Sequence, residues 1–205
     1  MRLERIRDAV RQELGHLLTM STIDNGQIDH AIAQSLIFLA NYYPSIEEAL
    51  TVAVSGPSQN LKTIQPLIHR IEYIRYPYDA DFPLNTGYPY SVTGSYTVAF
   101  SGVEPQVGET LQVTYKPRYT IADLYSATTT TLPDDELYEH PLVIAAAGHI
   151  LYLEGIRRTI TNTDPKIDPG KAMKELAGQF KQSAIEELNS NAGMLPNPAW
   201  SYIGL

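Results

Sequence analysis

The apolar residues of this chain change their spacing twice, and this change restricts the possible folds more than any other feature. Up to about Ser45 they recur every three or four residues, as on one face of a helix. From Ser45 to Pro133 that spacing is lost, and short alternating runs favour strands instead. Beyond Pro133 the helical spacing returns. We therefore expect an α+β protein with a β-rich segment inserted into a helical core.

Two helices are expected before the change. The apolar stripe of the first consists of Leu3, Ile6, Val10, Leu14 and Leu17. The second begins after Asp24, because Asp24 and Gln27 have the spacing of a capping box, and it ends before Pro44. The remaining face of the first helix carries Arg2, Arg5, Arg7 and Arg11. This arginine cluster is interpreted as a solvated face, with a surface for an acidic partner as the alternative.

The middle of the chain is rich in tyrosine and predicts an antiparallel sheet. Nine of the 14 tyrosines lie between Tyr73 and Tyr125. Strands are expected over residues 49–54, 67–76, 96–100 and 110–115, the last of which alternates apolar and polar residues. Residues 78–94 have no periodicity and predict a long loop, and loops of that length in compact domains are usually functional or mobile.

Two further helices are expected after the β-rich segment. Pro141 is predicted to separate a short acidic turn from the main third helix. The run of small residues at 145–148 would let another helix approach closely. The fourth helix is predicted to start with Asp168 as its N-cap and Pro169 at its first position, and to end near Gly193.

The predicted organisation is a four-helix core with an insertion between helices 2 and 3 and an extended C-terminal arm. The core comprises residues 1–45 and 133–192, the insertion residues 46–132, and the arm residues 193–205. The two ends of the insertion should lie close in space. The arm contains Pro196 and Pro198, which exclude regular helix, and the only tryptophan of the chain.

The residue types argue against several chemistries. The chain has no cysteine, which excludes disulfides, thiolate nucleophiles and cysteine-ligated metals. No two of its five histidines have the spacing of helix-borne metal ligands, and His149, on an apolar stripe, is interpreted as a hydrogen-bonded core residue. A nucleophile elbow and a phosphate-binding loop are both absent from the sequence. We therefore predict no catalytic residue, no cofactor and no metal site.

The charge balance also narrows the partners. Fifteen basic and 23 acidic residues give a net charge of -8 and a pI near 5.1, so the basic footprint of a DNA-binding protein is missing. The sequence has no apolar run of membrane-spanning length, and no membrane association is expected.

Aromatic and apolar residues in two segments are the candidates for partner binding, because tyrosine and tryptophan supply rigid contact area at protein interfaces. In the β-rich segment they are Tyr78, Tyr88 and Tyr90. In the C-terminal arm they are Leu195, Trp200, Tyr202, Ile203 and Leu205. An exposed arm of this composition is expected to dock, either on its own core or on a partner.

The order of these segments resembles the head–tail connector, or neck-adaptor, proteins of tailed bacteriophages. The resemblance rests on two helices ending in Tyr42-Tyr43-Pro44, a β insertion whose last strand continues to Tyr119, and a Thr-rich lead into Leu132-Pro133-Asp134-Asp135-Glu136-Leu137. It continues with the small-residue helix at Ala145-Ala146-Ala147-Gly148, a last charged helix and an extended tail. The insertion is longer and richer in tyrosine than that of short members of the family.

The resemblance implies a non-enzymatic structural role. The chain would form a homo-oligomeric ring, usually of twelve copies, under the portal protein and would offer its lower face to the tail or to a further neck protein. The genome would pass through the channel without specific binding, and the protein would be made in the host cytoplasm and reside in the neck of the virion. The helices would line the channel, the insertion would contact neighbouring copies or the tail, and the arm would reach the portal.

Two other classes of function stay open from the residues alone. The tyrosine-rich insertion could instead bind carbohydrate or a receptor, because tyrosines also stack on sugars. A hydrolase with catalytic residues dispersed along the sequence would show no local motif.

Overall fold

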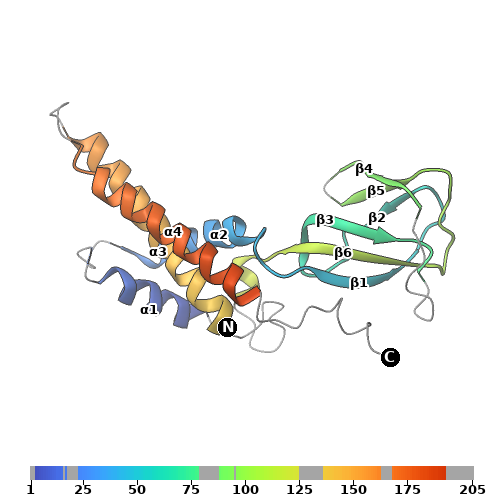
Figure 1. Ribbon diagram of the computed structural model, residues 1–205, viewed down its shortest axis with the longest axis horizontal. Helices are drawn as coiled ribbons and strands as arrows, with labels where there is room; N and C mark the ends of the chain where they lie inside the picture. The colour runs from blue at the N-terminus through green and yellow to red at the C-terminus, as the bar shows by residue number, and fades with distance from the viewer. Residues whose placement is uncertain are drawn as a thin grey trace. The chain divides into compact units, whose positions relative to one another are not determined.

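The computed structural model describes residues 3–15, 17, 23–78, 88–94, 96–124, 136–162 and 168–192. The chain divides into two compact units (Figure 1). The helical unit comprises Met1–Tyr42 and Tyr119–Leu205, and the β unit comprises Tyr43–Arg118. The α+β class and the insertion between the second and third helices are confirmed. The predicted arm, residues 193–205, lies outside the described residues.

The helical unit contains α1 (Leu3–Leu14), α2 (Asn25–Leu39), α3 (Glu136–Thr161) and α4 (Lys171–Ala192). A short 3-10 helix, η2 (Ile121–Leu124), also belongs to this unit and contacts α2. The structure therefore assigns Tyr119–Leu124 to the helical unit, whereas the boundary drawn from sequence lay at residue 132. Tyr119 and Leu124 are both buried, which explains why this segment packs as core.

Helices α1 and α2 form as the sequence predicts. Asp24 caps α2 through a complete capping box, in which the Gln27 N–H donates to the Asp24 carboxylate and the Asp24 N–H donates to the Gln27 side chain. The apolar stripes of both helices are buried, except that Leu17, predicted to belong to the first stripe, lies beyond the end of α1 and is exposed.

The interpretation of the arginine cluster as a solvated face is wrong for Arg7, whereas Arg5 is exposed and Arg11 half-buried. Arg7 is buried and donates to both oxygens of Asp29 on α2, while Arg5 pairs with Glu139 on α3. Arg11 pairs with Asp8 and also bonds Asn25. Because their guanidinium groups are engaged within the chain, these arginines join α1 to its neighbours.

Pro141 does not separate α3 from a preceding turn, contrary to the prediction: α3 continues through it. Proline at this position cannot donate the helical hydrogen bond to the carbonyl of Leu137. That carbonyl instead accepts a hydrogen bond of 3.0 Å from the side-chain amide of Asn191 on α4. A long-range side-chain bond thus replaces the missing local one, which sequence periodicity could not reveal.

Helices α3 and α4 run side by side as an antiparallel pair (Figure 1). Where the two helices touch, small residues recur every seven positions along each helix. Gly148 faces Ala177, and Gly155 faces Gly170, with a Cβ at Gly148 placed only 3.2 Å from the Ala177 carbonyl oxygen. Ala184 continues the α4 series and is fully buried. The expected close approach at the small residues of α3 is confirmed.

The start of α4 follows the prediction in its chemistry. The Asp168 carboxylate accepts the Gly170 N–H at 3.0 Å, as an N-cap does, and it also bonds Thr159 and Lys174. Regular helix begins at Lys171, because the preceding residues form a turn.

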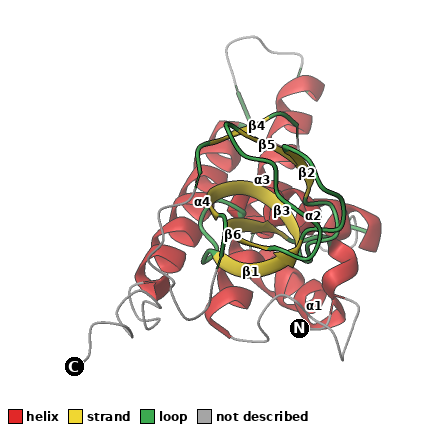
Figure 2. Cartoon of the chain, turned by 90° about the vertical axis from the view of Figure 1, so that its right-hand side faces the viewer, coloured by secondary structure: helices red, strands yellow, loops and turns green. Residues whose placement is uncertain are grey.

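The β unit consists of two three-stranded antiparallel sheets (Figure 2). One has the order β1-β6-β3, with β1 at Ile46–Thr51, β6 at Thr110–Arg118 and β3 at Leu67–Arg75. The other has the order β2-β5-β4, with β2 at Ser58–Asn60, β5 at Thr97–Phe100 and β4 at Tyr90–Val92. Strand β6 alternates buried and half-buried residues as predicted, and a common core includes Ile74, Val98, Leu111, Val113 and Tyr115.

The predictions for the β unit differ from the structure at several strands. Strand β2 was not predicted, and β6 continues to Arg118 instead of ending at residue 115. Strand β4 lies within the segment predicted to be a loop, because three residues are too few to show alternation. The first strand, expected at residues 49–54, is β1 at Ile46–Thr51. The ends of the unit do lie together, since Ile46 on β1 pairs with Tyr115 on β6. The chain therefore enters and leaves the β unit on neighbouring strands.

Candidate functional site

The first candidate surface lies on the β unit, and we call it the aromatic patch. It consists of Tyr73, Tyr76, Tyr88, Tyr90 and Phe100. The ring of Tyr76 lies 5.4 Å from that of Phe100 and 6.1 Å from that of Tyr88, and Tyr90 lies 6.3 Å from Phe100. Strands β3, β4 and β5 supply or flank these rings, so residues distant in sequence meet at one place.

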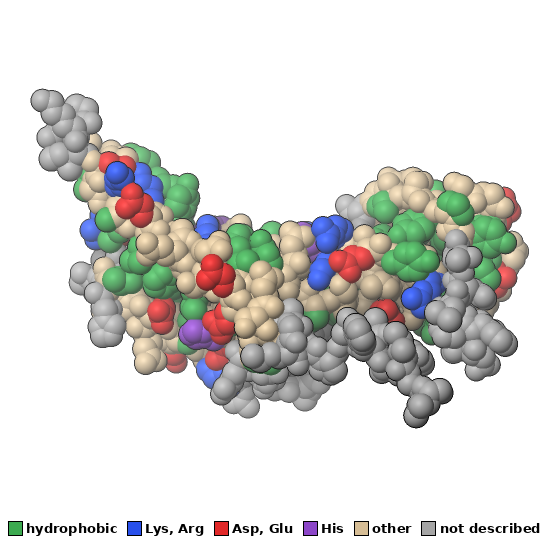
Figure 3. Space-filling view, in the orientation of Figure 1, with side chains coloured by type: hydrophobic (Ala, Val, Ile, Leu, Met, Phe, Trp, Pro, Cys, Tyr) green, Lys and Arg blue, Asp and Glu red, His purple; other side chains and the backbone are tan. Residues whose placement is uncertain are grey.

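The patch has a buried base and exposed tyrosines. Tyr76 and Phe100 are buried, whereas the exposed fractions of Tyr73 and Tyr88 are 42% and 45%. Val92, beside them on β4, is 55% exposed, and the Arg75 guanidinium lies 5.6 Å from the centre of the Tyr73 ring. In the space-filling view, hydrophobic side chains are visible on the surface of the β unit (Figure 3). Surfaces of this composition are typical of protein interfaces.

The phenols of Tyr76 and Tyr90 stay protonated at neutral pH. Burial, together with a hydrogen bond from the Tyr76 hydroxyl to Glu109, raises the pKa of Tyr76 to about 12. Burial likewise raises the pKa of Tyr90. The hydrogen bond from Tyr76, with one from the Gln106 N–H, lowers the pKa of Glu109. Tyr76 and Tyr90 are therefore poor nucleophiles and poor bases at neutral pH.

The structure places three of the predicted partner-binding residues on the β unit. Tyr88 and Tyr90 belong to the aromatic patch. Tyr78 is half-buried, and its N–H donates to the Thr110 carbonyl at 3.0 Å. The other five predicted residues, Leu195, Trp200, Tyr202, Ile203 and Leu205, lie outside the described residues.

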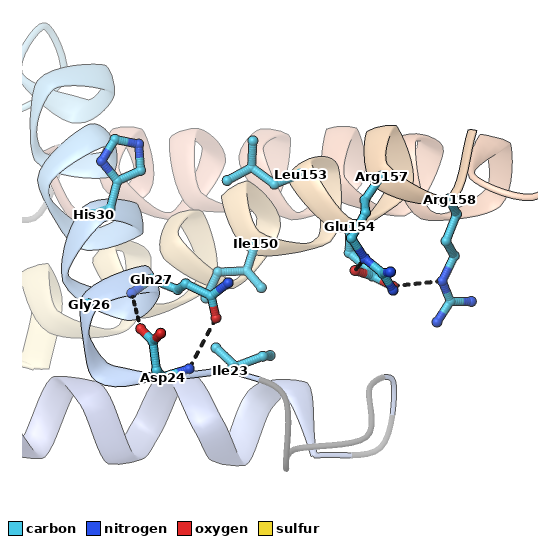
Figure 4. Close-up of a pocket in the computed structure, with 10 residues that line it drawn as sticks. All are labelled: Ile23, Asp24, Gly26, Gln27, His30, Ile150, Leu153, Glu154, Arg157 and Arg158. Carbon is cyan, nitrogen blue, oxygen red and sulfur yellow. Dashed lines mark hydrogen bonds and ion pairs between the residues drawn. The ribbon is translucent and has the colours of Figure 1, made fainter. Parts of the chain in front are cut away.

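The second candidate surface is a groove of about 780 Å³ on the helical unit (Figure 4). The start of α2 forms one wall and the second half of α3 the other. Ile23, Ile150 and Leu153 supply its apolar part, and the exposed fraction of Leu153 is 45%. We call this the α2–α3 groove. Its volume is in the range of pockets that hold several large side chains or a small molecule.

One end of the groove carries a compact charge cluster. Arg157 donates two hydrogen bonds to Glu154, of 2.6 and 2.7 Å, and the Arg158 Nε donates a third of 2.8 Å (Figure 4). These bonds and charges lower the pKa of Glu154 to about 2, although partial burial opposes the shift. One carboxylate between two guanidinium groups leaves an excess positive charge at this end, where Arg157 and Arg158 are 65% and 44% exposed.

The sequence analysis did not find the α2–α3 groove. It requires the capped start of α2 and the middle of α3 to lie together, although more than 100 residues separate them in the chain. One signal was available: Leu153 belongs to the apolar stripe of α3, yet it is exposed, as is Ile160 further along the same helix. A helix with more apolar residues than its partners can bury indicates an additional contact.

His149 is half-buried on α3 and lies beside His30 of α2, with ring centres 5.8 Å apart. Its Nε2 is buried without a hydrogen-bond partner among the described residues, so the predicted hydrogen-bonded core histidine is not fully satisfied. Burial lowers the pKa of His149, and the nearby charges of Lys181 and His30 lower it further.

A scan against protein-family models and a search of curated proteins found no match to this sequence. Within the described ranges, no cluster of three or more His, Asp or Glu side chains is arranged to hold a metal ion. No helix in the described part of the chain is long and apolar enough to cross a bilayer.

Proposed function

We propose that this protein is a non-enzymatic assembly component of a tailed-phage neck. In this proposal it forms a homo-oligomeric ring, of twelve copies by resemblance, that joins the portal protein to the tail or to a further neck protein. The genome passes through the ring without specific binding, as the net charge of -8 favours.

The observation that carries the proposal is that both compact units expose large apolar side chains. On the helical unit these are Leu17, Ile37, Tyr152, Leu153 and Ile160. On the β unit they are Val54, Tyr73, Tyr88, Val92 and Val107. The most exposed are Ile160 at 76% and Val54 at 74%. A ring subunit needs contact surfaces for two neighbours and for the structures above and below it, so several separate apolar surfaces suit this role.

The exposed residues at the tip of the β unit are held in place rather than scattered. The Val107 N–H donates to the Ser55 hydroxyl at 3.1 Å, and the Gly108 N–H donates to the Val52 carbonyl at 3.0 Å. These bonds fix the loops that carry Val54 and Val107 beside each other. A preformed pair of exposed valines loses little conformational entropy on contact, which favours a role in protein association.

The test is the assembly state of the purified chain, alone and with capsids that carry a portal but lack neck proteins. We expect concentration-dependent oligomers by mass photometry, closed rings by negative-stain microscopy, and retention on the capsids. A double variant, Tyr88→Ser with Val92→Ser, should weaken assembly, whereas Gln179→Ser on the exposed surface of α4 should not. A chain that stays monomeric alone and does not bind the capsids would overturn the proposal.

A carbohydrate- or receptor-binding role is the second candidate, and the aromatic patch favours it specifically. Tyr73 and Tyr88 expose their rings on one unit, and a tyrosine side chain combines stacking area with a hydroxyl that can hydrogen-bond. Glycan-array binding that is lost on Tyr88→Ala, in a protein that forms no ring, would support this role over assembly.

A further inference from the structure

We propose that the α2–α3 groove binds the C-terminal arm of a second copy of this chain, with Trp200 as the main anchor. This inference rests on the self-assembly part of the proposed function and identifies one of its contacts. It pairs a groove that exposes Leu153 with an arm whose apolar residues would otherwise contact water.

The chemistry of the two partners matches. The floor of the groove is apolar, with Ile23, Ile150 and Leu153, and its volume of about 780 Å³ is enough for a few large side chains. Residues 193–205 contain Trp200, Tyr202 and Ile203 and no Asp, Glu, Lys or Arg. Burying such a segment removes apolar area from water without removing the hydration of a charge.

The charged end of the groove suits an aromatic anchor. The guanidinium groups of Arg157 and Arg158 are fixed by Glu154 yet remain largely exposed. A planar, immobilised guanidinium offers a face on which an indole ring stacks at low entropic cost. Trp200 can therefore place its ring against the arginines while Tyr202 and Ile203 cover the apolar floor.

Distance argues that the arm comes from another copy. In the α3–α4 register, Gly148 faces Ala177 and Gly155 faces Gly170, so Arg157, at the end of the groove where Trp200 is placed, lies opposite Asp168 at the start of α4. From Asp168 the chain continues to Ala192, a length of about 36 Å at 1.5 Å per residue.

Trp200 is eight residues beyond Ala192. Even a fully extended chain, at no more than about 3.6 Å per residue, gives these eight residues a reach of about 29 Å. None of the described residues of α4 lines the groove, so a path within one copy would have to pass around the helix pair and would be longer than about 36 Å. Trp200 therefore falls short of the arginines of its own copy, whereas the arm of a neighbouring copy is not limited by this distance.

The binding test uses a fluorescently labelled peptide of residues 194–205 and the full-length chain carrying Trp200→Ala, so that the arms of other copies compete only weakly for the groove. We expect saturable binding by fluorescence anisotropy. Leu153→Asp, added to this chain, should weaken the affinity by about tenfold or more, because it places a carboxylate on the apolar floor. Ile160→Asp is the matched control: it lies on the same helix, is more exposed and does not line the groove, and it should leave the affinity unchanged.

Three results would overturn the inference. The first is no peptide binding, and the second is equal binding to the Leu153→Asp and Ile160→Asp chains. The third is that the Trp200→Ala chain binds the peptide whereas the monomeric wild-type chain does not. In that case the arm of the wild-type chain fills the groove of its own copy. Far-UV circular dichroism melting of each variant verifies that it is folded.

A mixing experiment separates this inference from the proposed function. Leu153→Asp and Trp200→Ala chains, each unable to close a ring, should associate with each other, because one retains the arm and the other the groove. Rings that persist in the Leu153→Asp chain would defeat the groove assignment and leave the adaptor proposal intact. Specific peptide binding by a chain that forms no ring and does not bind portal-bearing capsids would support the groove assignment and overturn the adaptor proposal.

Discussion

Replacing Gly148 by alanine should destabilise the helical unit, although the same change elsewhere in a helix is stabilising. In a helix interior, alanine is favoured over glycine by about 1 kcal/mol. A Cβ at Gly148, however, would lie 2.9 Å from the Cβ of Phe180 and 3.2 Å from the carbonyl oxygen of Ala177. Neither atom is the end of a flexible side chain, so α3 and α4 must separate.

The size of the effect follows from these two opposing contributions. Overpacking a close contact typically costs about 1–3 kcal/mol, so the Gly148→Ala chain should lose about 1 kcal/mol of its free energy of unfolding after the helical gain is subtracted. Gly178 on α4 is the matched control, because nothing lies within 4 Å of its built Cβ. Gly178→Ala should raise the free energy of unfolding by about 0.5–1 kcal/mol.

The two variants are compared by urea unfolding followed by far-UV circular dichroism, with thermal melting as a second measurement. We expect the midpoints to move in opposite directions from that of the wild type. If Gly148→Ala stabilises the chain as much as Gly178→Ala does, the seven-residue register of α3 and α4 is wrong, and the distance argument for the arm fails with it.

Three further outcomes follow from single contacts. Asn191→Ala should lower the free energy of unfolding by about 1 kcal/mol, because it removes the hydrogen bond from Asn191 to the half-buried Leu137 carbonyl. The exposed Asn189→Ala should have little effect in the same urea titration. Arg7→Lys should lower the free energy of unfolding by about 1 kcal/mol, since an ammonium cannot make the two-point contact that the Arg7 guanidinium makes with Asp29. Arg11→Lys is the control in thermal melts, because Arg11 is more exposed than Arg7. The pKa of His149 is lowered in the folded chain, so the neutral imidazole stabilises the fold fully above the unfolded pKa near 6.5, and this stabilisation is lost as the pH falls below that value. Between pH 7.5 and pH 5 the urea midpoint should therefore fall less steeply for His149→Gln than for the wild type. Equal slopes of midpoint against pH would refute this.

The sequence predicted the fold where a local signal was strong. The capping box at Asp24 and Gln27 located the start of α2, and the alternation along β6 identified a half-buried strand. The change of periodicity placed the β unit between α2 and α3. These features depend on neighbours in sequence, so a single chain is enough to detect them.

The sequence predictions failed where distant residues decide the structure. Pro141 carries a helix-ending signal, yet Asn191 compensates for it from 50 residues away. Arg7 has the composition of a surface residue, but Asp29 on another helix allows it to be buried. Among the candidate sites, Tyr88 and Tyr90 could be singled out by composition, whereas the α2–α3 groove depends on how two separate segments pack.

The way the chain enters and leaves the β unit leads to a final prediction about folding. Ile46 and Tyr115 are paired residues on β1 and β6, and the Lys116 ammonium donates to the Tyr43 carbonyl at 2.8 Å, so the two crossing points lie next to each other. Replacing residues 43–118 by a short Gly/Ser linker therefore closes a small gap, and the entropic cost of loop closure changes little, since it grows only slowly with loop length. The helical unit has its own core, including Ile32, Leu36 and Leu142. The shortened chain should give a helical circular dichroism spectrum and a cooperative thermal transition, while losing whatever assembly contacts the aromatic patch supplies. A shortened chain that is unfolded would show that the helical unit depends on the β unit for its stability, and that the two do not fold as separate units.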